Sequence, residues 1–307
     1  MSVERALDHL RTGTAATVAL AVADLEGAAR AGDPEAPRHL ATLAAAGIGM
    51  PQSWARALSH LFAAAMAGSM SARGQLAVLS GKGQGVDLGE NTPAYWRMLC
   101  ATVRIEDWLR PCEKTVLNAS PRTVAIEAFL HTATCDWLIG LARGRLAPAM
   151  TYDAAGAAAL TAKARSNSAI ELGLTECDVV VLLTRQRMAA IIGVPVTALE
   201  PSQILHYATG EQFARHHDYL DPALPEVAEH GQRIVTFLVY LNDAFEGGET
   251  DFPRLGLRHK GRPGDALYFG NLQADGAPDP RTVHAGLAPT SGAKWLLSQW
   301  IRDRARV

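Results

Sequence analysis

The sequence predicts an α+β protein in which helices precede a β-rich core. Two observations support this. In the first third of the chain, alanine is abundant and apolar residues recur at intervals of three and four, the period of amphipathic helices. From residue 203 onward, short apolar runs alternate with turn-forming residues, which is typical of the strands of a sandwich or barrel. Helices placed before such strands indicate the α+β class.

Composition limits the partners and the location of the protein. Of its 307 residues, 48% are hydrophobic and 20% are charged, so the chain can bury a sizeable core. A formal net charge of -2 does not favour a nucleic-acid partner. No apolar run approaches the roughly 20 residues that span a bilayer, and residues 1–11 lack the apolar segment of a signal peptide. We therefore expect a cytoplasmic protein that does not associate with membranes.

An internal repeat organises the region from residue 1 to residue 90. Segments 28–33 (AARAGD) and 64–69 (AAMAGS) lie 36 residues apart, and apolar residues around them match at the same offset. Within each copy the apolar residues have helical spacing, so each copy is interpreted as a pair of helices. The repeat is similar in length to helical repeats of the tetratricopeptide type. The sequence thus predicts an α-helical repeat region over residues 1–90.

Two interpretations of this region stay open. A solenoid usually needs about three repeats to bury a continuous core, and the chain offers two clear copies. In one interpretation the repeats bind a protein or peptide partner through a concave face. In the other they form a helical cap that stabilises the following domain, or they dock on another subunit.

A glycine-rich, polar joint over residues 82–92 follows the repeats. Thr92 and Pro93 have the features of a helix start, with proline at the first helical position. The helix is expected to end before Pro111. The sequence therefore predicts a helical linker over residues 91–118 and a further domain over residues 119–307.

Within the predicted domain of residues 119–307, helical and strand patterns follow one another. We expect helices over residues 125–141 and 178–192, and strands over residues 204–207, 234–241, 265–269, 282–284 and 294–301. Most of these strands follow the helices, which agrees with the α+β class.

The segment His216-His217-Asp218 contains a potential metal site. Residues i and i+2 of a strand point to the same face, so His216 and Asp218 can bind one metal while His217 points away. Two histidines and one carboxylate are the ligands of non-haem Fe(II) oxygenases, which keep open coordination positions. The third ligand has to come from another strand. His284 suits this role because it ends the short strand expected over residues 282–284 and precedes turn residues.

A His-x-Asp triplet alone is a weak signal, because most such histidines are ordinary surface or hydrogen-bonded residues. Its surroundings are more specific. In chain order they are Tyr207-x-x-Gly210, Tyr240-Leu241-Asn242-Asp243, Gly247-Gly248-Glu249-Thr250-Asp251-Phe252, Pro263-Gly264-Asp265, His284-Ala285-Gly286 and Gly292-Ala293-Lys294-Trp295. This order resembles the prolyl 4-hydroxylase family of Fe(II)/2-oxoglutarate-dependent dioxygenases. The resemblance covers residues 119–302 and is strongest from residue 203 onward.

The resemblance implies a double-stranded β-helix, a jelly-roll sandwich with supporting helices, for residues 119–307. It implies that His216, Asp218 and His284 are the iron ligands and the catalytic centre. Lys294 would pair with the distal carboxylate of 2-oxoglutarate, which a fixed ammonium group suits. Further residues carried over from the family are Tyr207 and Thr236 as 2-oxoglutarate contacts, and Arg233 and Trp300 as substrate contacts.

Structural roles stay open for several of these residues. Tyr207 is also explained as a packed aromatic residue of a strand, Arg233 as a surface arginine and Trp300 as a core residue. Residues 165–168 (RSNS) resemble the loop that closes over substrate in the family, although a polar connector has the same composition.

Two further histidines lie near the predicted ligands. The family pattern uses neither His206 nor His217 as a ligand, and we interpret both as structural.

The resemblance implies an enzyme that uses Fe(II), 2-oxoglutarate and O2 to hydroxylate an unactivated C–H bond, with release of succinate and CO2. Asp218 favours hydroxylation, because related halogenases lack this carboxylate. Ascorbate dependence is common in the family, and ascorbate is a candidate cofactor here.

Three functions follow from these observations. The favoured one is hydroxylation of a prolyl residue in a peptide or protein, which the helical repeats support weakly. The second is the same chemistry on a free amino acid or a small natural-product precursor. The third is a binding or scaffold protein whose jelly roll has lost catalysis, and the complete ligand set argues against it.

Overall fold

The computed structural model describes residues 2–149, 151–152, 158–159 and 164–305. Its internal contacts divide the chain into two compact units. The first unit comprises Met1–Arg110 and Gly173–Arg187, and the second comprises Pro111–Leu172 and Met188–Val307. The domain boundaries that the composition indicates, at residues 90 and 118, stay predictions.

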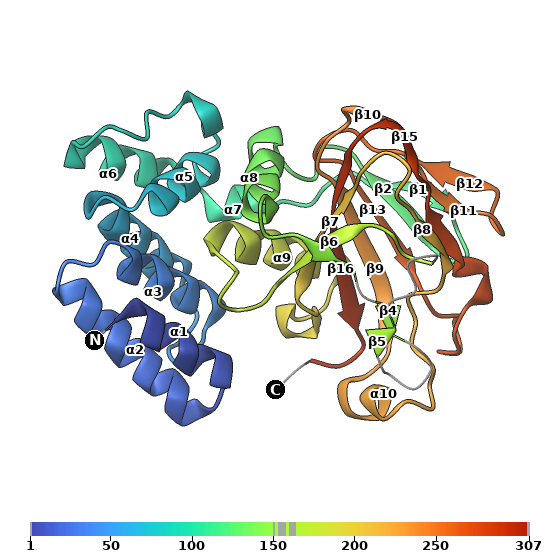
Figure 1. The fold of residues 1–307 in the computed structure, drawn as a ribbon, viewed down its shortest axis with the longest axis horizontal. Helices are drawn as coiled ribbons and strands as arrows, with labels where there is room; N and C mark the ends of the chain where they lie inside the picture. Colours follow the sequence, from blue (N-terminus) through green and yellow to red (C-terminus); the bar gives the residue numbers. More distant parts are fainter. Residues whose placement is uncertain (1, 150, 153–157, 160–163, 306–307) are drawn as a thin grey trace. The chain divides into compact units, whose positions relative to one another are not determined.

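The described part of the first unit is built from helices (Figure 1). They are α1 (Val3–Thr12), α2 (Ala15–Arg30), α3 (Glu35–Ala46), α4 (Trp54–Met66), α5 (Met70–Leu79), α6 (Pro93–Thr102), α7 (Ile105–Trp108) and the part of α9 (Val179–Ile192) up to Arg187. Alanines such as Ala21, Ala36 and Ala64 are fully buried. Their small side chains let neighbouring helices approach closely.

The turns after α2 and α4 have the same backbone hydrogen bonds, 36 residues apart. The N–H groups of Asp33 and Ser69 each donate to the carbonyl oxygen five residues earlier, at 3.0 and 2.9 Å. Gly32 and Gly68, which precede them, have φ angles of 90° and 99°. This similarity supports a repeated helix pair, while the tetratricopeptide-like assignment itself stays a prediction.

The helix predicted to follow the polar joint is interrupted. Pro93 occupies the start of α6 as expected. The helix ends at Thr102, because Val103 and Arg104 have extended backbone with ψ angles of 117° and 100°. α7 is therefore a separate short helix. No helix in the described residues is both long and apolar enough to cross a membrane.

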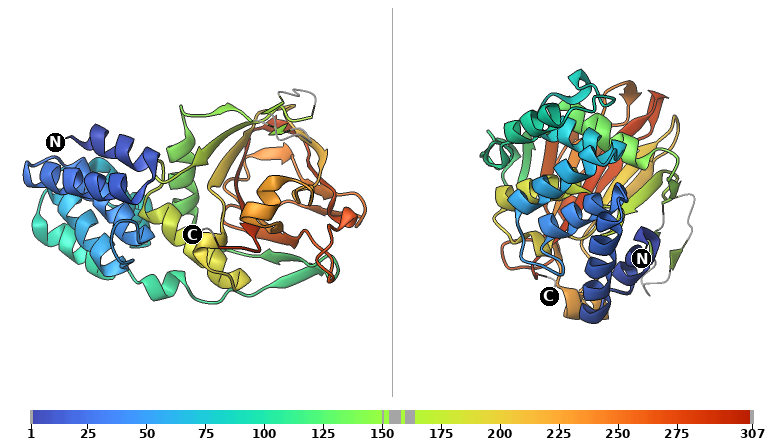
Figure 2. Two further views of the ribbon diagram at one scale, coloured as in Figure 1. Left: turned by 90° about the horizontal axis from the view of Figure 1, so that it is seen from below. Right: turned by 90° about the vertical axis from the view of Figure 1, so that its left-hand side faces the viewer.

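Two antiparallel sheets dominate the second unit (Figure 2). The larger has the strand order β1-β2-β13-β9-β16-β7-β6-β3, and the smaller has the order β12-β11-β14-β8. The strands are β1 (Thr115–Asn118), β2 (Thr123–Ile126), β3 (Ala147–Pro148), β6 (Ser168–Leu172), β7 (Ser202–Tyr207), β8 (Phe213–His216), β9 (Arg233–Tyr240), β11 (Thr250–Phe252), β12 (Leu257–His259), β13 (Ala266–Gly270), β14 (His284–Gly286) and β16 (Lys294–Arg302).

Shorter elements complete this unit. The pairs β4 (Thr151–Tyr152) with β5 (Ala158–Ala159) and β10 (Phe245–Gly247) with β15 (Pro289–Gly292) form two-stranded ribbons, and the helices are α8 (Thr132–Ala142) and α10 (Pro225–His230). α8 packs against β7 of the larger sheet.

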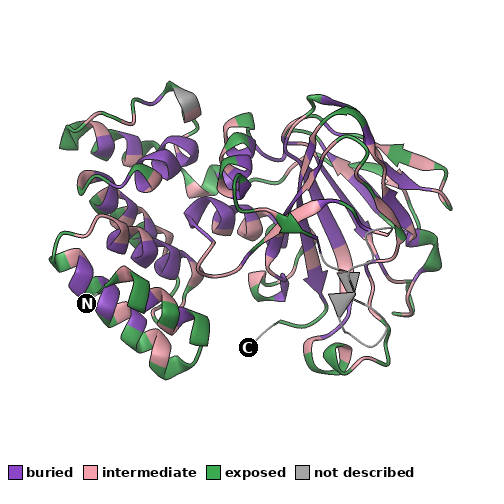
Figure 3. Ribbon diagram, in the orientation of Figure 1, coloured by how far each residue is buried: buried purple, intermediate pink, exposed green. Residues whose placement is uncertain are grey.

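A hydrophobic core lies between the two sheets. Leu205, Leu238, Leu267 and Leu296 come from four central strands of the larger sheet, and they share one buried cluster with Phe252 of the smaller sheet. Side chains alternate between the two faces of a strand, so every second residue of these strands contributes to this core. Figure 3 shows the central strands as mostly buried. The predicted α+β, jelly-roll class is confirmed.

Two predicted elements differ from the structure. The helix expected over residues 125–141 begins only at Thr132, because residues 123–126 form β2 and pair with β13. The strand expected over residues 282–284 begins at His284 instead of ending there. Residues 280–282 form a 3-10 turn, which Asp279 caps by accepting a hydrogen bond from the Arg281 N–H group. The ends of the other expected strands and of the second helix shift by at most two residues.

Candidate metal centre

Three potential metal ligands meet between the sheets of the second unit. His216 ends β8, Asp218 follows it, and His284 begins β14, where the antiparallel register places it opposite His216. One ligand atom from each lies within 4.8 Å of the others. Nε2 of His216 is 3.6 Å from Oδ1 of Asp218, and Nε2 of His284 is 3.4 Å from Oδ2. The structure thus brings together the three residues that the sequence spacing predicts.

The same local contact orients both imidazoles. Nδ1 of His216 lies 2.8 Å from the carbonyl oxygen of Ala214, and Nδ1 of His284 lies 3.0 Å from that of Thr282. A carbonyl oxygen can only accept, so Nδ1 of each ring donates to it, and Nε2 is the nitrogen that faces Asp218. Burial, together with the neighbouring His284, lowers the pKa of His216 to about 3. The His216 ring is therefore neutral at physiological pH.

Asp218 is held from the facing sheet. Its carboxylate is buried, and Oδ2 accepts a hydrogen bond of 2.7 Å from Oγ1 of Thr236 in β9. Burial alone would raise the pKa of Asp218, but the imidazoles of His284 and His216 and the Thr236 hydrogen bond outweigh it. The pKa of Asp218 consequently lies below its ordinary value, so the residue carries a negative charge beside the two histidines.

This donor set fits Fe(II). Two imidazole nitrogens and one carboxylate oxygen are the ligands of the two-histidine, one-carboxylate triad of non-haem iron oxygenases. Within the part of the chain that the structure describes, these three residues form the one group of histidine, cysteine and acidic side chains with such spacing. The chemistry of the donors therefore matches the metal that the sequence predicts.

A buried lysine lies in the same pocket as the three ligands. Lys294 begins β16, is fully buried, and donates from Nζ to the carbonyl oxygen of Gly248 at 2.6 Å. That acceptor is neutral, so among the described residues the ammonium has no counter-ion at hydrogen-bonding distance. Burial lowers the pKa of Lys294 to about 7. Such a group suits the carboxylate of a bound acid.

Tyr207 and two glycines shape the space around Lys294. Tyr207 pairs with Lys294 across β7 and β16, and its ring centroid lies 5.0 Å from Nζ. Burial raises the pKa of Tyr207 to about 12, so its hydroxyl stays protonated. A Cβ at Gly286 would lie 3.2 Å from that hydroxyl oxygen. Gly248 has a φ of 70°, and a Cβ there would approach the Phe245 ring to 2.9 Å, so glycine is needed where the carbonyl meets Lys294.

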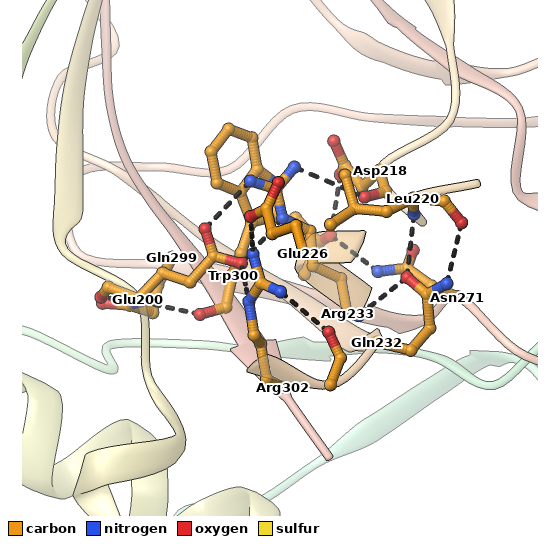
Figure 4. A network of polar contacts seen from close by, with 12 residues as sticks. Glu200, Asp218, Leu220, Glu226, Gln232, Arg233, Asn271, Gln299, Trp300 and Arg302 are labelled. Atoms are coloured by element: carbon orange, nitrogen blue, oxygen red, sulfur yellow. Dashed lines mark hydrogen bonds and ion pairs between the residues drawn. The ribbon is translucent and has the colours of Figure 1, made fainter. Parts of the chain in front are cut away.

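Arg233 and Trp300 lie beside Asp218 (Figure 4). The Arg233 guanidinium is 3.6 Å from the centroid of the Trp300 ring, and its Nε and Nη2 donate to Glu200 at 2.8 and 2.9 Å. Arg302, which is 1% exposed, donates to the same carboxylate at 2.7 Å. Arg233 is therefore an ion-paired residue stacked on Trp300, and the interpretation of Arg233 as a plain surface arginine is wrong.

Trp300 itself lines the pocket. Its Nε1 is buried and has no hydrogen-bond partner among the described residues.

Of the remaining predicted residues, His206 and His217 lie outside the ligand group, whereas Thr236 lines the pocket. His206 packs against Trp295 with ring centroids 4.4 Å apart, and His217 stacks on Tyr219 at 4.6 Å. Both histidines lie outside the ligand group, as the strand geometry and the family pattern predict. Thr236 lines the pocket, and its hydroxyl hydrogen is directed to Asp218, so a contact with 2-oxoglutarate stays a prediction.

The segment of residues 165–168 contributes to the pocket through Arg165. This guanidinium is largely buried and lies 4.5 Å from the centroid of the Phe213 ring. The Phe213 ring in turn stacks on His216 with centroids 3.5 Å apart. Sequence reasoning did not single out Phe213, because an aromatic residue in a strand carries no specific signal for this contact.

Sequence reasoning also missed Glu200. A signal was available, since Glu200 is the sole acidic residue between Asp178 and Glu211 and stands in a mostly apolar segment. An isolated charge in such a segment indicates a buried ion pair. Its partner, Arg233, is distant in sequence and could not be identified from the pattern.

Comparison with known proteins supports the chemistry of the site. Residues 202–302 match the 2OG-Fe(II) oxygenase superfamily. Prolyl 4-hydroxylase 1 of Arabidopsis thaliana is 31% identical over 204 residues, which cover 62% of this chain and 72% of that protein. Probable prolyl 4-hydroxylase 6 of the same plant is 33% identical over 215 residues, covering 64% of this chain and 74% of that protein.

Among solved structures, a viral collagen prolyl hydroxylase from Paramecium bursaria Chlorella virus-1, in a 2OG complex, is 28% identical. The match covers 59% of this chain and 95% of that chain, with a TM-score of 0.45.

The superfamily match contains the three ligand residues together with Tyr207 and Lys294. The plant enzymes match over more than two thirds of their own length at above 30% identity, which extends well beyond these motifs. The chain belongs to the prolyl 4-hydroxylase family of Fe(II)- and 2-oxoglutarate-dependent dioxygenases.

Proposed function

We propose that this dioxygenase hydroxylates a prolyl residue of a peptide or protein substrate. The observation that carries the proposal is the meeting of His216, Asp218, His284 and the buried Lys294 in one pocket. The names of the relatives, which are prolyl 4-hydroxylases, support proline as the target.

Each residue of the pocket has a role in this proposal. His216 and His284 offer Nε2 lone pairs, and Asp218 offers a negative oxygen, so that together they hold Fe(II). Bound iron supplies, with 2-oxoglutarate and O2, the oxidation of a C–H bond, and succinate and CO2 are released. Lys294 pairs with the distal carboxylate of 2-oxoglutarate, and the protonated hydroxyl of Tyr207 donates to the same group. Thr236 lines the same pocket.

Arg233 and Trp300 form the substrate side in this proposal. The ring of Trp300 offers a flat apolar face of the kind on which a proline ring packs. Arg233 holds the Trp300 ring in place through its stacking contact.

Succinate formation tests the metal and co-substrate assignments. Purified protein with Fe(II) and 2-oxoglutarate should form succinate, slowly even without a prime substrate. His216→Ala and Asp218→Ala should lose this activity, because two protein ligands hold the metal poorly. Thr123→Val, which removes a buried hydroxyl in β2 outside the pocket, serves as the control. Succinate production at the wild-type rate in both ligand variants would exclude the assigned triad.

The choice of substrate needs a separate experiment. Proline-rich peptides and free amino acids are offered in parallel, and mass spectrometry detects the gain of one oxygen atom. We expect hydroxylated proline in the peptides. Product from free amino acids or small precursors, with none from any peptide, would show that the alternative substrate class is correct.

We also propose that ascorbate sustains repeated turnover, as the family resemblance implies. The test compares the number of turnovers with and without ascorbate at saturating 2-oxoglutarate. Equal numbers in both conditions would argue against a role for ascorbate.

We propose that the predicted helical repeats bind a protein or peptide partner and that the protein is located in the cytoplasm. Cell fractionation tests the location. Crosslinking in cells, followed by mapping of the linked peptides, tests the partner-binding role. Crosslinks confined to residues 111–307 would contradict a partner-binding role of the helices.

A further inference from the structure

The two oxygens of Asp218 have different surroundings. Oδ2 accepts a hydrogen bond of 2.7 Å from Oγ1 of Thr236. Thr236 in turn accepts one of 3.1 Å from Nδ2 of Asn271. Thr236 and Asn271 are 1% and 0% exposed, so both side chains of this chain of hydrogen bonds are buried. Figure 4 shows Asn271 and Asp218 in the same polar network.

The direction of this chain of hydrogen bonds follows from the donors available. An ionised carboxylate can only accept, so the single hydroxyl hydrogen of Thr236 has to point to Asp218. The lone pair of Thr236 is then left to accept, which requires that Asn271 present its NH2 group. The backbone holds Asn271 in place, since its N–H donates to Ile234 and its carbonyl oxygen accepts from the Asp279 N–H.

We propose that Thr236, oriented by Asn271, is a positioning residue that occupies Oδ2 of Asp218 and leaves Oδ1 as the single oxygen offered to Fe(II). This inference rests on the proposed role of Asp218 as an iron ligand. It gives Thr236 a function different from the contact with 2-oxoglutarate that the family resemblance implies.

The number of Asp218 oxygens that bind the metal decides how many coordination positions stay open for the reaction. A carboxylate can bind a metal through one oxygen or through both. If Asp218 used both, it would occupy a position that the triad otherwise leaves open for 2-oxoglutarate or O2. Partners that orient a metal ligand in this way typically change metal affinity by about 10- to 100-fold when they are removed.

A purely structural role would have a different signature. In that case the Thr236 hydroxyl would only satisfy a buried carboxylate, and its loss would lower stability without a specific effect on the metal. Thr123 provides a matched comparison, because it is fully buried in β2 of the same sheet and its Oγ1 donates to the carbonyl oxygen of Pro121 at 3.3 Å. It does not line the pocket.

The first test measures metal affinity without catalysis. Metal-free wild type, Thr236→Val, Thr236→Ser and Thr123→Val are titrated with Mn(II), and free Mn(II) is followed by electron paramagnetic resonance. Thr236→Val should bind Mn(II) about 10- to 100-fold more weakly. Thr236→Ser should restore most of the affinity, and Thr123→Val should match the wild type. Equal affinity in wild type and Thr236→Val would overturn the inference.

A second test uses the wild type alone and so does not depend on how Thr236→Val folds. A crystal structure with Mn(II) should show one Asp218 oxygen on the metal and the other at hydrogen-bonding distance from Thr236. Binding of the metal through both oxygens would overturn the inference while leaving the proposed function intact. Wild type that binds Mn(II) no better than His216→Ala would instead refute the triad, and the inference would fail with it.

Discussion

At Lys294, burial and charge are in conflict. Its ammonium group is enclosed between sheets with a neutral carbonyl as its close partner, and burial lowers its pKa to about 7. The charge of Glu249 opposes this shift, while that of Lys260 adds to it. In the free enzyme, Lys294 therefore loses its charge within the physiological pH range.

This pKa predicts how 2-oxoglutarate binding depends on pH. The charged form pairs with a carboxylate, so affinity should be highest below about pH 7 and should fall as the pH rises above it. Lys294→Met should weaken binding by about 2 kcal/mol or more and should make it far less dependent on pH. Calorimetric titration of the metal-loaded protein across this range measures both effects. A wild-type affinity that is constant from about pH 6 to pH 9 would contradict the assignment.

The same shift has a consequence for stability. Between the lowered pKa of folded Lys294 and its ordinary value in the unfolded chain, the unfolded state binds more protons. The contribution of Lys294 to the free energy of unfolding should therefore increase as the pH rises through this window. Urea unfolding of wild type and Lys294→Met should show that the methionine variant gains more stability near neutral pH than at alkaline pH.

Glu200 is a second residue for which burial and charge predict the effect of a substitution on stability. It is 6% exposed and forms ion pairs with both Arg233 and Arg302. Glu200→Gln leaves the buried Arg302 and the partly buried Arg233 without their shared counter-ion, which should lower the free energy of unfolding by about 3–5 kcal/mol.

Glu226→Gln is the matched control for this change. Glu226 contacts Arg302 in the same network, but its side chain is 48% exposed. We expect a loss below about 1 kcal/mol, because water screens this pair. Similar urea midpoints for the two variants would show that the burial of Glu200 does not determine its importance.

At the scale of elements, the pairing of two short strands brings the triad together. β8 and β14 are antiparallel, so their register sets His216 beside His284, and Asp218 follows two residues later. The larger sheet supplies Thr236 from β9 and Lys294 from β16, which are neighbouring strands. The pocket therefore forms only because the two sheets pack face to face.

Gly264 lies in the loop between β12 and β13 and contacts the end of β9, the neighbour of β13 in the sheet. Its N–H donates to the carbonyl oxygen of Tyr240, and its own carbonyl oxygen accepts from the Leu130 N–H. With a φ of 91° and a Cβ position only 2.0 Å from the Leu130 oxygen, Gly264→Ala should cost at least about 1–3 kcal/mol of stability. Gly270→Ala is the control, since its Cβ would meet nothing closer than 4.0 Å. Thermal unfolding compares them, and equal melting temperatures would refute the steric argument.

At the scale of the whole molecule, all residues assigned to iron, 2-oxoglutarate and substrate lie in the second unit. Ligands that bind only the folded form stabilise it by about 2.7 kcal/mol at a hundred times their dissociation constant. Mn(II) with 2-oxoglutarate should therefore slow hydrogen exchange in β7, β9, β14 and β16. The helices α2 to α5 should exchange at unchanged rates. Protection of those helices to the same degree would mean that the ligand couples the two units.

Sequence patterns predicted the local features of the molecule well. The i, i+2 spacing selected His216 and Asp218 and set His217 aside, and the order of the family motifs added His284 and Lys294. Predictions failed where local propensity and tertiary pairing disagree. Residues 123–126 have an apolar pattern that also suits a helix, and only the pairing with β13 makes them a strand.

The sequence by itself was enough to predict the family, the three candidate metal ligands and Lys294 as the candidate partner of 2-oxoglutarate, because these predictions depend on residue type and on the order and spacing of motifs along the chain. The tertiary structure decided which oxygen of Asp218 is occupied by Thr236, that Glu200 neutralises Arg233, and that Phe213 stacks on His216. The Asp218 and Arg233 contacts join residues from different strands or loops. The Phe213 contact depends on the side-chain orientations of Phe213 and His216, which both belong to β8. The cause in each case is packing between elements, which no local period in the sequence encodes.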